Sequence, residues 1–120
     1  MPKTILIADD NESVRTILKL TLQFKGYNLI EVDNGAKALE TLKTTEVDLL
    51  ISDIDMPQMN GLELLAALRA DPKFASLPIL ICSAEQDATE ENIVARGASG
   101  FLTKPCPPSE LLGAVAKFVG

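Results

Sequence analysis

Short, continuous apolar runs alternate along the chain with stretches in which apolar residues recur every three or four positions. A run of the first kind is typical of a strand buried on both faces, and the second spacing is typical of a helix with one buried face. The pattern predicts strands at residues 4–8, 29–32, 48–52, 78–82 and 99–103. An amphipathic helix is expected after each of these strands.

Polar residues mark where several helices should begin, because a side-chain oxygen before the first turn can accept a hydrogen bond from an unpaired backbone N–H. Asn60 and Glu63 have the spacing of a capping box at the start of the third helix. Asp87 and Glu90 offer a cap to the fourth helix, and Asp33 is expected to cap the second.

Helical spacing also predicts which faces of the first and last helices are buried. On the first helix these residues are Val14, Ile17, Leu18 and Leu22. On the last helix, which begins at residues 107–109, they are Leu111, Leu112, Val115 and Phe118.

The alternation of strands and helices implies an α/β protein with a parallel sheet covered by helices on both faces. For five such units we expect the flavodoxin-like, doubly wound fold with strand order 2-1-3-4-5 and five helices. The 120 residues fit one domain spanning residues 1–120. Ligands of such folds bind beyond the carboxyl ends of the strands, where the winding direction reverses.

Composition and charge narrow the classes of partner. The chain carries 17 acidic and 11 basic residues without a basic cluster, which argues against direct binding of nucleic acid. Two cysteines and no histidine argue against a zinc site of the usual kind. No apolar stretch approaches the roughly 20 residues of a membrane span, and no signal peptide is evident. We therefore expect a cytoplasmic protein with no membrane partner.

Polar side chains follow four of the predicted strands at the carboxyl edge of the sheet. After the first, third, fourth and fifth strands come, in turn, Asp9 with Asp10, Asp53, Ser83 and Lys104. These strands are neighbours in the order 2-1-3-4-5, so we expect the side chains to converge on one pocket. Each residue alone has an ordinary interpretation as a helix cap, loop acid, turn residue or solvated lysine. Their shared position favours a functional site.

The predicted pocket has a defined chemistry. Two carboxylates ~4 Å apart repel by about 4 kcal/mol at an effective dielectric of about 20. Oxygen ligands without histidine favour a hard divalent cation, with Mg²⁺ first and Mn²⁺ or Ca²⁺ after it. Lys104 adds a positive charge, so a phosphate group can join the cluster once the metal is bound. An aspartate can then act as a nucleophile and form an aspartyl phosphate.

Four stretches of the chain resemble the receiver domain of two-component response regulators. They are residues 5–11 (ILIADDN), 49–61 (LLISDIDMPQMNG), 78–84 (PILICSA) and 97–105 (GASGFLTKP). The resemblance extends over essentially the whole chain, and it fits both a single-domain regulator of the chemotaxis type and a receiver domain taken from a larger protein. It implies that Asp53 is the phosphoacceptor, which receives its phosphoryl group from a phosphohistidine on a histidine kinase or phosphotransfer protein.

The same resemblance implies a set of magnesium ligands. Asp10 and Asp53 would bind Mg²⁺ directly, together with the backbone carbonyl of Asp55, and Asp9 would act through a metal-bound water. Position 55 varies within the family. The charge of Asp55 at the pocket mouth is expected to alter the lifetime of the phosphorylated state or the affinity for the cation.

The resemblance also implies phosphate-binding and switch residues. Ser83 would supply the hydroxyl group that turns toward the phosphoryl group, helped by the backbone N–H of Ala84. Lys104 would pair with the phosphate, and the bond between Lys104 and Pro105 is expected to be cis. Phe101 matches the aromatic position whose rotamer follows the active state, although it lacks the hydroxyl of a tyrosine.

The implied function is a signalling switch whose fourth helix, fifth strand and fifth helix form a face that controls a downstream protein. Such a domain is not an enzyme beyond catalysing its own phosphorylation and dephosphorylation.

One alternative is a phosphatase of the haloacid dehalogenase type, because Asp53-Ile54-Asp55 resembles its Asp-x-Asp pair. That pair normally follows the first strand, however, and the other motifs of that class need a longer chain. The second alternative is an interaction module that works without phosphorylation, and the complete set of strand-end residues argues against it.

Overall fold

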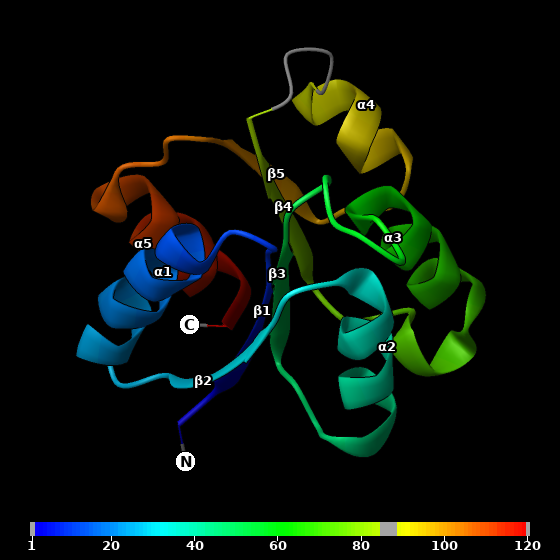
Figure 1. The fold of residues 1–120 in the computed structure, drawn as a ribbon, viewed down its shortest axis with the longest axis horizontal. Coiled ribbons are helices and arrows are strands. Elements are labelled where there is room, and N and C mark those ends of the chain that lie inside the picture. The colour runs from blue at the N-terminus through cyan, green and yellow to red at the C-terminus, as the bar shows by residue number, and fades with distance from the viewer. Residues whose placement is uncertain (1, 85–88, 120) are drawn as a thin grey trace.

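The computed structural model of the protein describes residues 2–84 and 89–119. Within these residues, strands and helices alternate as predicted (Figure 1). The strands are β1 (Thr4–Ala8), β2 (Asn28–Val32), β3 (Leu49–Ser52), β4 (Ile79–Ser83) and β5 (Gly100–Thr103). The helices are α1 (Glu12–Phe24), α2 (Gly35–Thr44), α3 (Gly61–Ala70), α4 (Glu90–Ala95) and α5 (Pro108–Val119), with a short 3₁₀ helix, η1 (Pro72–Phe74), after α3. Every predicted strand boundary lies within one residue of the observed boundary.

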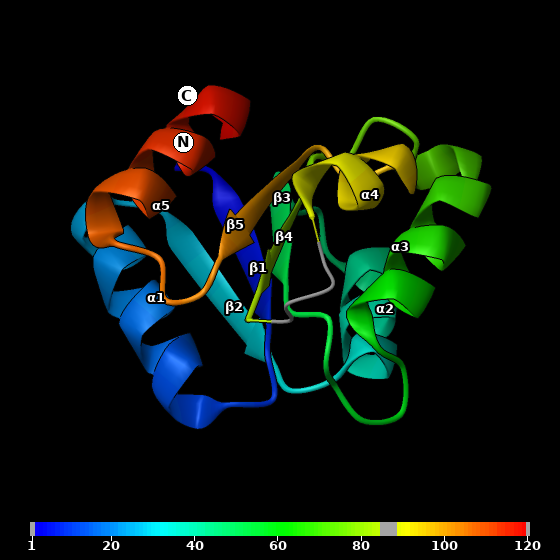
Figure 2. The ribbon, with the colours of Figure 1, turned by 90° about the horizontal axis from the view of Figure 1, so that it is seen from above.

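The strands form a parallel sheet in the order β2-β1-β3-β4-β5, which confirms the predicted fold. β1 lies between β2 and β3, so Ile5 is in register with Leu29 on one side and Leu49 on the other. Helices α1 and α5 cover one face of the sheet, and α2, α3 and α4 cover the other (Figure 2). The carboxyl ends of β1, β3, β4 and β5 therefore meet along one edge, next to the point where the winding reverses.

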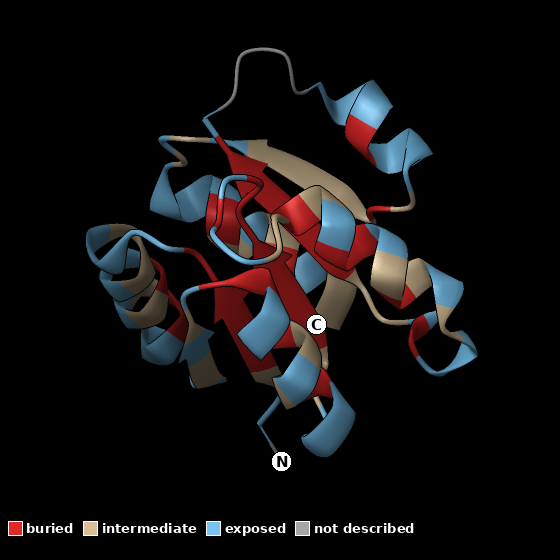
Figure 3. Cartoon of the chain, turned by 45° about the vertical axis from the view of Figure 1, so that its right-hand side comes forward, coloured by how far each residue is buried: buried red, intermediate tan, exposed pale blue. Residues whose placement is uncertain are grey.

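Two apolar clusters, one on each face of the sheet, hold the layers together. Successive residues of β1 alternate between them: Leu6 and Ala8 belong to the cluster under α2, α3 and α4, whereas Ile5 and Ile7 belong to the cluster under α1 and α5. The central strands are buried and the outer sides of the helices are exposed (Figure 3). Each fully buried Leu or Ile contributes roughly 1.5–3 kcal/mol, so the strand ends that carry the polar residues are firmly anchored.

The predicted cap of α3 is correct and that of α2 is wrong. Asn60 and Glu63 form the capping box, in which the Glu63 N–H donates to Asn60 Oδ1 at 2.8 Å and the Asn60 N–H donates to Glu63 Oε1 at 3.0 Å. At α2 the Lys37 N–H donates to Asn34 at 2.8 Å rather than to Asp33. The carboxylate of Asp33 is exposed and lies 3.3 Å from Lys37 Nζ, so it pairs with the side chain instead of the helix end.

Two further helix starts use neutral side chains. Thr89 caps α4 by accepting a hydrogen bond from the Asn92 N–H at 3.2 Å, and the predicted cap, Asp87, lies outside the described residues. Asn11 caps α1 by accepting from the Val14 N–H at 3.1 Å. The two aspartates before Asn11 are therefore not used as the cap of this helix.

The predicted buried face of α1 is correct at Leu18 and Leu22 but wrong at Ile17, which is 61% exposed. Consecutive residues lie about 100° apart around a helix, so Ile17 points away from the sheet when Leu18 faces it. On α5, Leu111 and Val115 are buried as predicted, and the other two predicted residues are half-buried.

Glycine is required where α3 begins, because the helix starts against the end of β3. The Gly61 N–H donates to the Ile54 carbonyl at 2.8 Å, and a Cβ atom on Gly61 would lie 1.9 Å from the carbonyl oxygen of Asp53. Gly35 at the start of α2 meets the same loop, and its N–H donates to the Met59 carbonyl at 2.9 Å. The loop after Asp53 is therefore fixed between two helices.

We expect Gly61→Ala to lower the free energy of unfolding by about 2–3 kcal/mol, because the added methyl group overlaps backbone atoms that cannot move aside easily. Urea denaturation measures the change. Gly113→Ala is the matched control: a Cβ at Gly113 meets nothing within 4 Å, so it is expected to stabilise α5 by about 0.5–1 kcal/mol. Equal effects of the two substitutions would contradict this account.

Candidate phosphorylation and metal site

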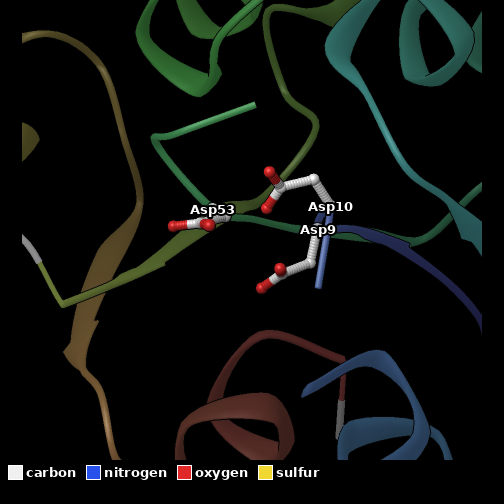
Figure 4. A group of neighbouring side chains, drawn as sticks. All are labelled: Asp9, Asp10 and Asp53. Atoms are coloured by element: carbon white, nitrogen blue, oxygen red, sulfur yellow. The ribbon is translucent and has the colours of Figure 1, made fainter. Parts of the chain in front are cut away.

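Three carboxylates meet at the carboxyl edge of the sheet. Asp9 and Asp10 follow β1, and Asp53 follows the neighbouring strand β3 (Figure 4). One oxygen of each carboxylate lies within 4.8 Å of an oxygen from each of the other two. Asp9 and Asp53 are only 2% and 8% exposed, whereas Asp10 is exposed. The cluster is therefore embedded in the protein but open to solvent on one side.

Backbone hydrogen bonds between neighbouring strands fix the two buried acids. The Asp53 N–H donates to the Ala8 carbonyl at 2.9 Å, and the Asp9 N–H donates to the Val32 carbonyl at 3.1 Å. Their carboxylates accept further backbone hydrogen bonds, Asp53 Oδ1 from the Ile54 N–H at 2.8 Å and Asp9 Oδ1 from the Asn11 N–H at 2.9 Å. The positions of both acids thus follow from the register of the sheet.

Lys104 reaches the same cluster from the end of β5. Its backbone N–H donates to the Ser83 carbonyl at 2.9 Å, which continues the pairing of β4 with β5. Its Nζ atom lies 2.6 Å from Asp9 Oδ2 and 3.2 Å from Asp53 Oδ2, so one ammonium group contacts both buried acids. The peptide bond between Lys104 and Pro105 is cis, as expected.

Burial and neighbouring charges shift the pKa values of two groups in the cluster. Burial raises the pKa of Asp53, and the negative charge of Asp9 acts in the same direction, so together they outweigh the lowering effect of Lys104. For Lys104, burial opposes the charged form, but the hydrogen bond to Asp9 and the charges of both acids outweigh it and raise the pKa. A further positive charge near Asp53 would therefore stabilise its ionised carboxylate.

The remaining predicted residues surround this cluster. Ser83 is the last residue of β4 and is 1% exposed, and Ala84 follows it at the surface. Phe101 is half-buried on β5, in register with Ile81, and packs against the apolar cluster under α3 and α4. Asp55 is exposed in the loop after β3. The roles of these residues, like those of the acids and Lys104, stay predictions.

One residue that contacts the site was not among those predicted from the sequence. Arg15 on α1 donates a hydrogen bond from Nη1 to the backbone carbonyl of Asp9 at 2.7 Å. The only signal in the sequence was its spacing, because a residue near the start of a helix that follows a strand end can reach back to that end. Lysine and arginine at such positions are usually solvated, so the contact depends on the actual packing of α1.

Comparison with known proteins identifies the family. The model of the response regulator receiver domain matches residues 5–116 of the chain. The chain belongs to this family. Receiver domains are signalling domains of two-component systems, and they bind Mg²⁺ at an acidic pocket of the kind formed here by the three aspartates. Within the described residues, no helix combines the length and apolarity needed to span a membrane.

Individual relatives agree with this assignment. The receiver domain is 38% identical over 109 residues to a protein of Arabidopsis thaliana named as two-component response regulator ARR21; the match spans 89% of this chain but 17% of that protein. The structure of this receiver domain is similar to that of a response regulator from Chloroflexus aurantiacus J-10-fl. The TM-score is 0.93 at 32% identity, and the match covers 99% of this chain and 98% of the other. Chemotaxis response regulator CheY4 of Vibrio cholerae gives a TM-score of 0.89 at 32% identity, covering 98% and 99% of the chains.

The raised pKa of Asp53 leads to a prediction about stability. In the metal-free receiver domain, ionised Asp53 opposes folding because its pKa in the folded state lies above the ordinary value of 3.8. We expect Asp53→Asn to raise the free energy of unfolding at neutral pH. The gain should shrink as the pH falls through the raised pKa toward 3.8, since Asp53 is then protonated in both states.

Urea denaturation in the presence of a chelator, from neutral to mildly acidic pH, measures this effect. Asp33→Asn is the control, because the hydrogen bond from Lys37 lowers the pKa of Asp33 and its replacement should give no gain at neutral pH. A loss of stability in Asp53→Asn at neutral pH would show that the attraction of ionised Asp53 to Lys104 outweighs the cost of burying its charge.

Proposed function

We propose that this receiver domain is a phosphorylation-controlled switch of a two-component phosphorelay. It accepts a phosphoryl group on Asp53 from a phosphohistidine on a histidine kinase or phosphotransfer protein. The observation that carries the proposal is the position of the Asp53 carboxylate, which is buried, lies within 4.8 Å of two further acids and is 3.2 Å from Lys104 Nζ. An anion that approaches Asp53 meets a lysine on one side and a cation-binding group of acids on the other.

The donor set fits Mg²⁺. The acids offer hard oxygen ligands, and the exposed carboxylate of Asp10 leaves room for the water molecules that Mg²⁺ retains. Asp10 and Asp53 would hold the ion directly with the backbone carbonyl of Asp55, and Asp9 would hold it through a water molecule. When bound, Mg²⁺ offsets the repulsion between the Asp53 carboxylate and the incoming phosphoryl group.

The proposed transfer forms a bond between a carboxylate oxygen of Asp53 and phosphorus, and it breaks the phosphorus–nitrogen bond of the phosphohistidine. The released ring nitrogen takes up a proton. Lys104 pairs with one phosphoryl oxygen, and the Ser83 hydroxyl and the Ala84 N–H donate to others, because charge-assisted hydrogen bonds of this kind stabilise the transferring group.

We further propose that the phosphoryl group shifts an equilibrium between two conformations. Ser83 at the end of β4 and Phe101 on β5 lie on neighbouring strands, so movement of Ser83 toward the phosphoryl group is coupled to the rotamer of Phe101. The α4-β5-α5 face then changes for a downstream protein. A shift from 1:99 to 99:1 requires about 5.5 kcal/mol of differential stabilisation, which several charge-assisted hydrogen bonds can supply.

The surface beside the site suits a protein donor. α1 exposes Ile17 and Leu20, each with an exposed fraction of 61%. A mainly apolar pocket of about 350 Å³ separates this helix from the segment around Lys104 and Pro105. Apolar side chains of a helical donor can therefore pack against α1 while its phosphohistidine reaches Asp53.

The central test is incubation with acetyl phosphate and Mg²⁺, followed by intact-mass measurement. We expect the wild type to gain one phosphoryl group, Asp53→Asn to gain none, and the exposed control Asp33→Asn to be labelled like the wild type. Labelling of Asp53→Asn would refute the assignment of the acceptor.

Two other results would favour the alternative functions. Continuous turnover of a generic phosphomonoester would favour the haloacid dehalogenase alternative. Unchanged partner binding in Asp53→Asn, with and without phosphodonor, would favour a phosphorylation-independent module.

A separate prediction concerns Asp55, whose exposed carboxylate adds negative charge at the mouth of the site. We expect Asp55→Asn to weaken Mg²⁺ binding by about two- to fivefold, because an exposed unit charge ~8 Å from a dication contributes about 1 kcal/mol in water, and to change the lifetime of the phosphorylated protein. Calorimetric titration with Mg²⁺ and the decay of the phosphorylated species measure the two effects. Identical affinities and lifetimes in both proteins would exclude a role for Asp55.

A further inference from the structure

Arg15 connects the acidic cluster to the edge of the sheet. Its Nη1 donates to the backbone carbonyl of Asp9 at 2.7 Å, a short distance that is typical of a charge-assisted hydrogen bond. The side chain is only 17% exposed, although it comes from a surface helix. The guanidinium group therefore lies between α1 and the end of β1 and is not free in solvent.

An ion pair on the other side of the guanidinium group links it to β2. Arg15 Nε lies 3.6 Å from Glu31 Oε1 on the edge strand β2, and Lys19 Nζ lies 3.3 Å from Glu31 Oε2. Glu31 thus holds Arg15 against β2 while Arg15 holds the backbone at Asp9. Both carboxylate oxygens of Asp9 are also engaged, one by the Asn11 N–H and the other by Lys104. The backbone and side chain of Asp9 are tied down independently.

The backbone contact matters for the next residue as well. The Asp9 carbonyl belongs to the planar peptide group that also contains the N–H and Cα atoms of Asp10. A hydrogen bond that fixes this oxygen fixes the peptide plane and, with it, the position of the Asp10 Cα atom from which the side chain leaves the chain. Asp10 is exposed, so its carboxylate depends on the backbone for its orientation more than buried Asp9 does.

We propose that Arg15 is a positioning residue for the metal site: through the Asp9 carbonyl it orients the Asp9–Asp10 peptide so that both acids face the cation. This inference rests on the proposed magnesium-dependent function and extends it to a residue that contacts neither the metal nor the phosphoryl group. The expected effect of removing Arg15 on the affinity for Mg²⁺ is opposite in sign to the effect of its charge alone. A positive charge near a dication opposes metal binding, so loss of that charge alone would raise the affinity for Mg²⁺.

The test compares Mg²⁺ affinities by calorimetric titration of the unphosphorylated protein. We expect Arg15→Gln to lower the affinity about tenfold, the size of effect found when a group that orients a metal ligand is removed. Arg15→Lys keeps the charge and one donor and should fall between Arg15→Gln and the wild type. Lys19→Gln is the matched control, because it removes a cation that pairs with the same Glu31 but leaves the contact between Arg15 and Asp9 intact.

Two further measurements separate positioning from charge and from general stability. Titrations at about 0.15 M and about 0.5 M salt should give the same ratio between wild type and Arg15→Gln, since screening weakens long-range charge effects but not a hydrogen bond. The rate of phosphorylation by acetyl phosphate should fall in Arg15→Gln at low Mg²⁺ and recover at saturating Mg²⁺. Glu31→Gln, which keeps Arg15 but removes its anchor, should show a smaller loss of affinity and serves if Arg15→Gln folds poorly.

The outcomes are distinct. An unchanged or raised Mg²⁺ affinity in folded Arg15→Gln overturns the inference, as does a loss of equal size in Lys19→Gln. A wild-type protein that binds no Mg²⁺ would instead refute the proposed function itself. A wild type that binds Mg²⁺ and is labelled on Asp53, together with an Arg15→Gln variant of equal affinity, would refute the role of Arg15 alone.

Discussion

Repulsion between carboxylates that the fold forces together is the constraint on which the site depends. Asp9 and Asp53 end adjacent strands and are almost fully buried, so neither can move away from the other without disturbing the sheet. Lys104 offsets part of this cost from a third strand end, because its ammonium group contacts both acids. The parallel sheet with the strand order β1-β3-β4-β5 brings these three ends together at one edge, so the chemistry of the site depends directly on the fold.

The compensation by Lys104 is incomplete. The pKa of Asp53 stays raised despite the lysine, mainly because the carboxylate is buried and also because Asp9 is negatively charged, so the ionised form of Asp53 is disfavoured in the metal-free protein. Under the proposed function, a cation would offset this cost, and the combined positive charge of the cation and Lys104 would then favour a phosphoryl group on Asp53.

Much of this was predictable from sequence, for a physical reason. Buried parallel strands are continuous apolar runs, and the polar residue after each run marks the strand end, so the positions of Asp53 and Lys104 followed once the order 2-1-3-4-5 was assumed. Features that depend on side-chain direction were not predictable in this way. Ile17 was assigned to the wrong side of its helix, Asn34 rather than Asp33 caps α2, and the reach of Arg15 to Asp9 depends on how α1 packs.

The close approach of Gly61 to the Asp53 carbonyl has a consequence for how motion can leave the site. The first residue of α3 meets the backbone of Asp53 with no side chain between them, and Gly35 at the start of α2 is hydrogen-bonded to the same loop. Backbone atoms at the start of α3 block any shift of Asp53 toward α2 and α3. A displacement that begins at Asp53 is therefore directed the other way, across the sheet toward β4 and β5.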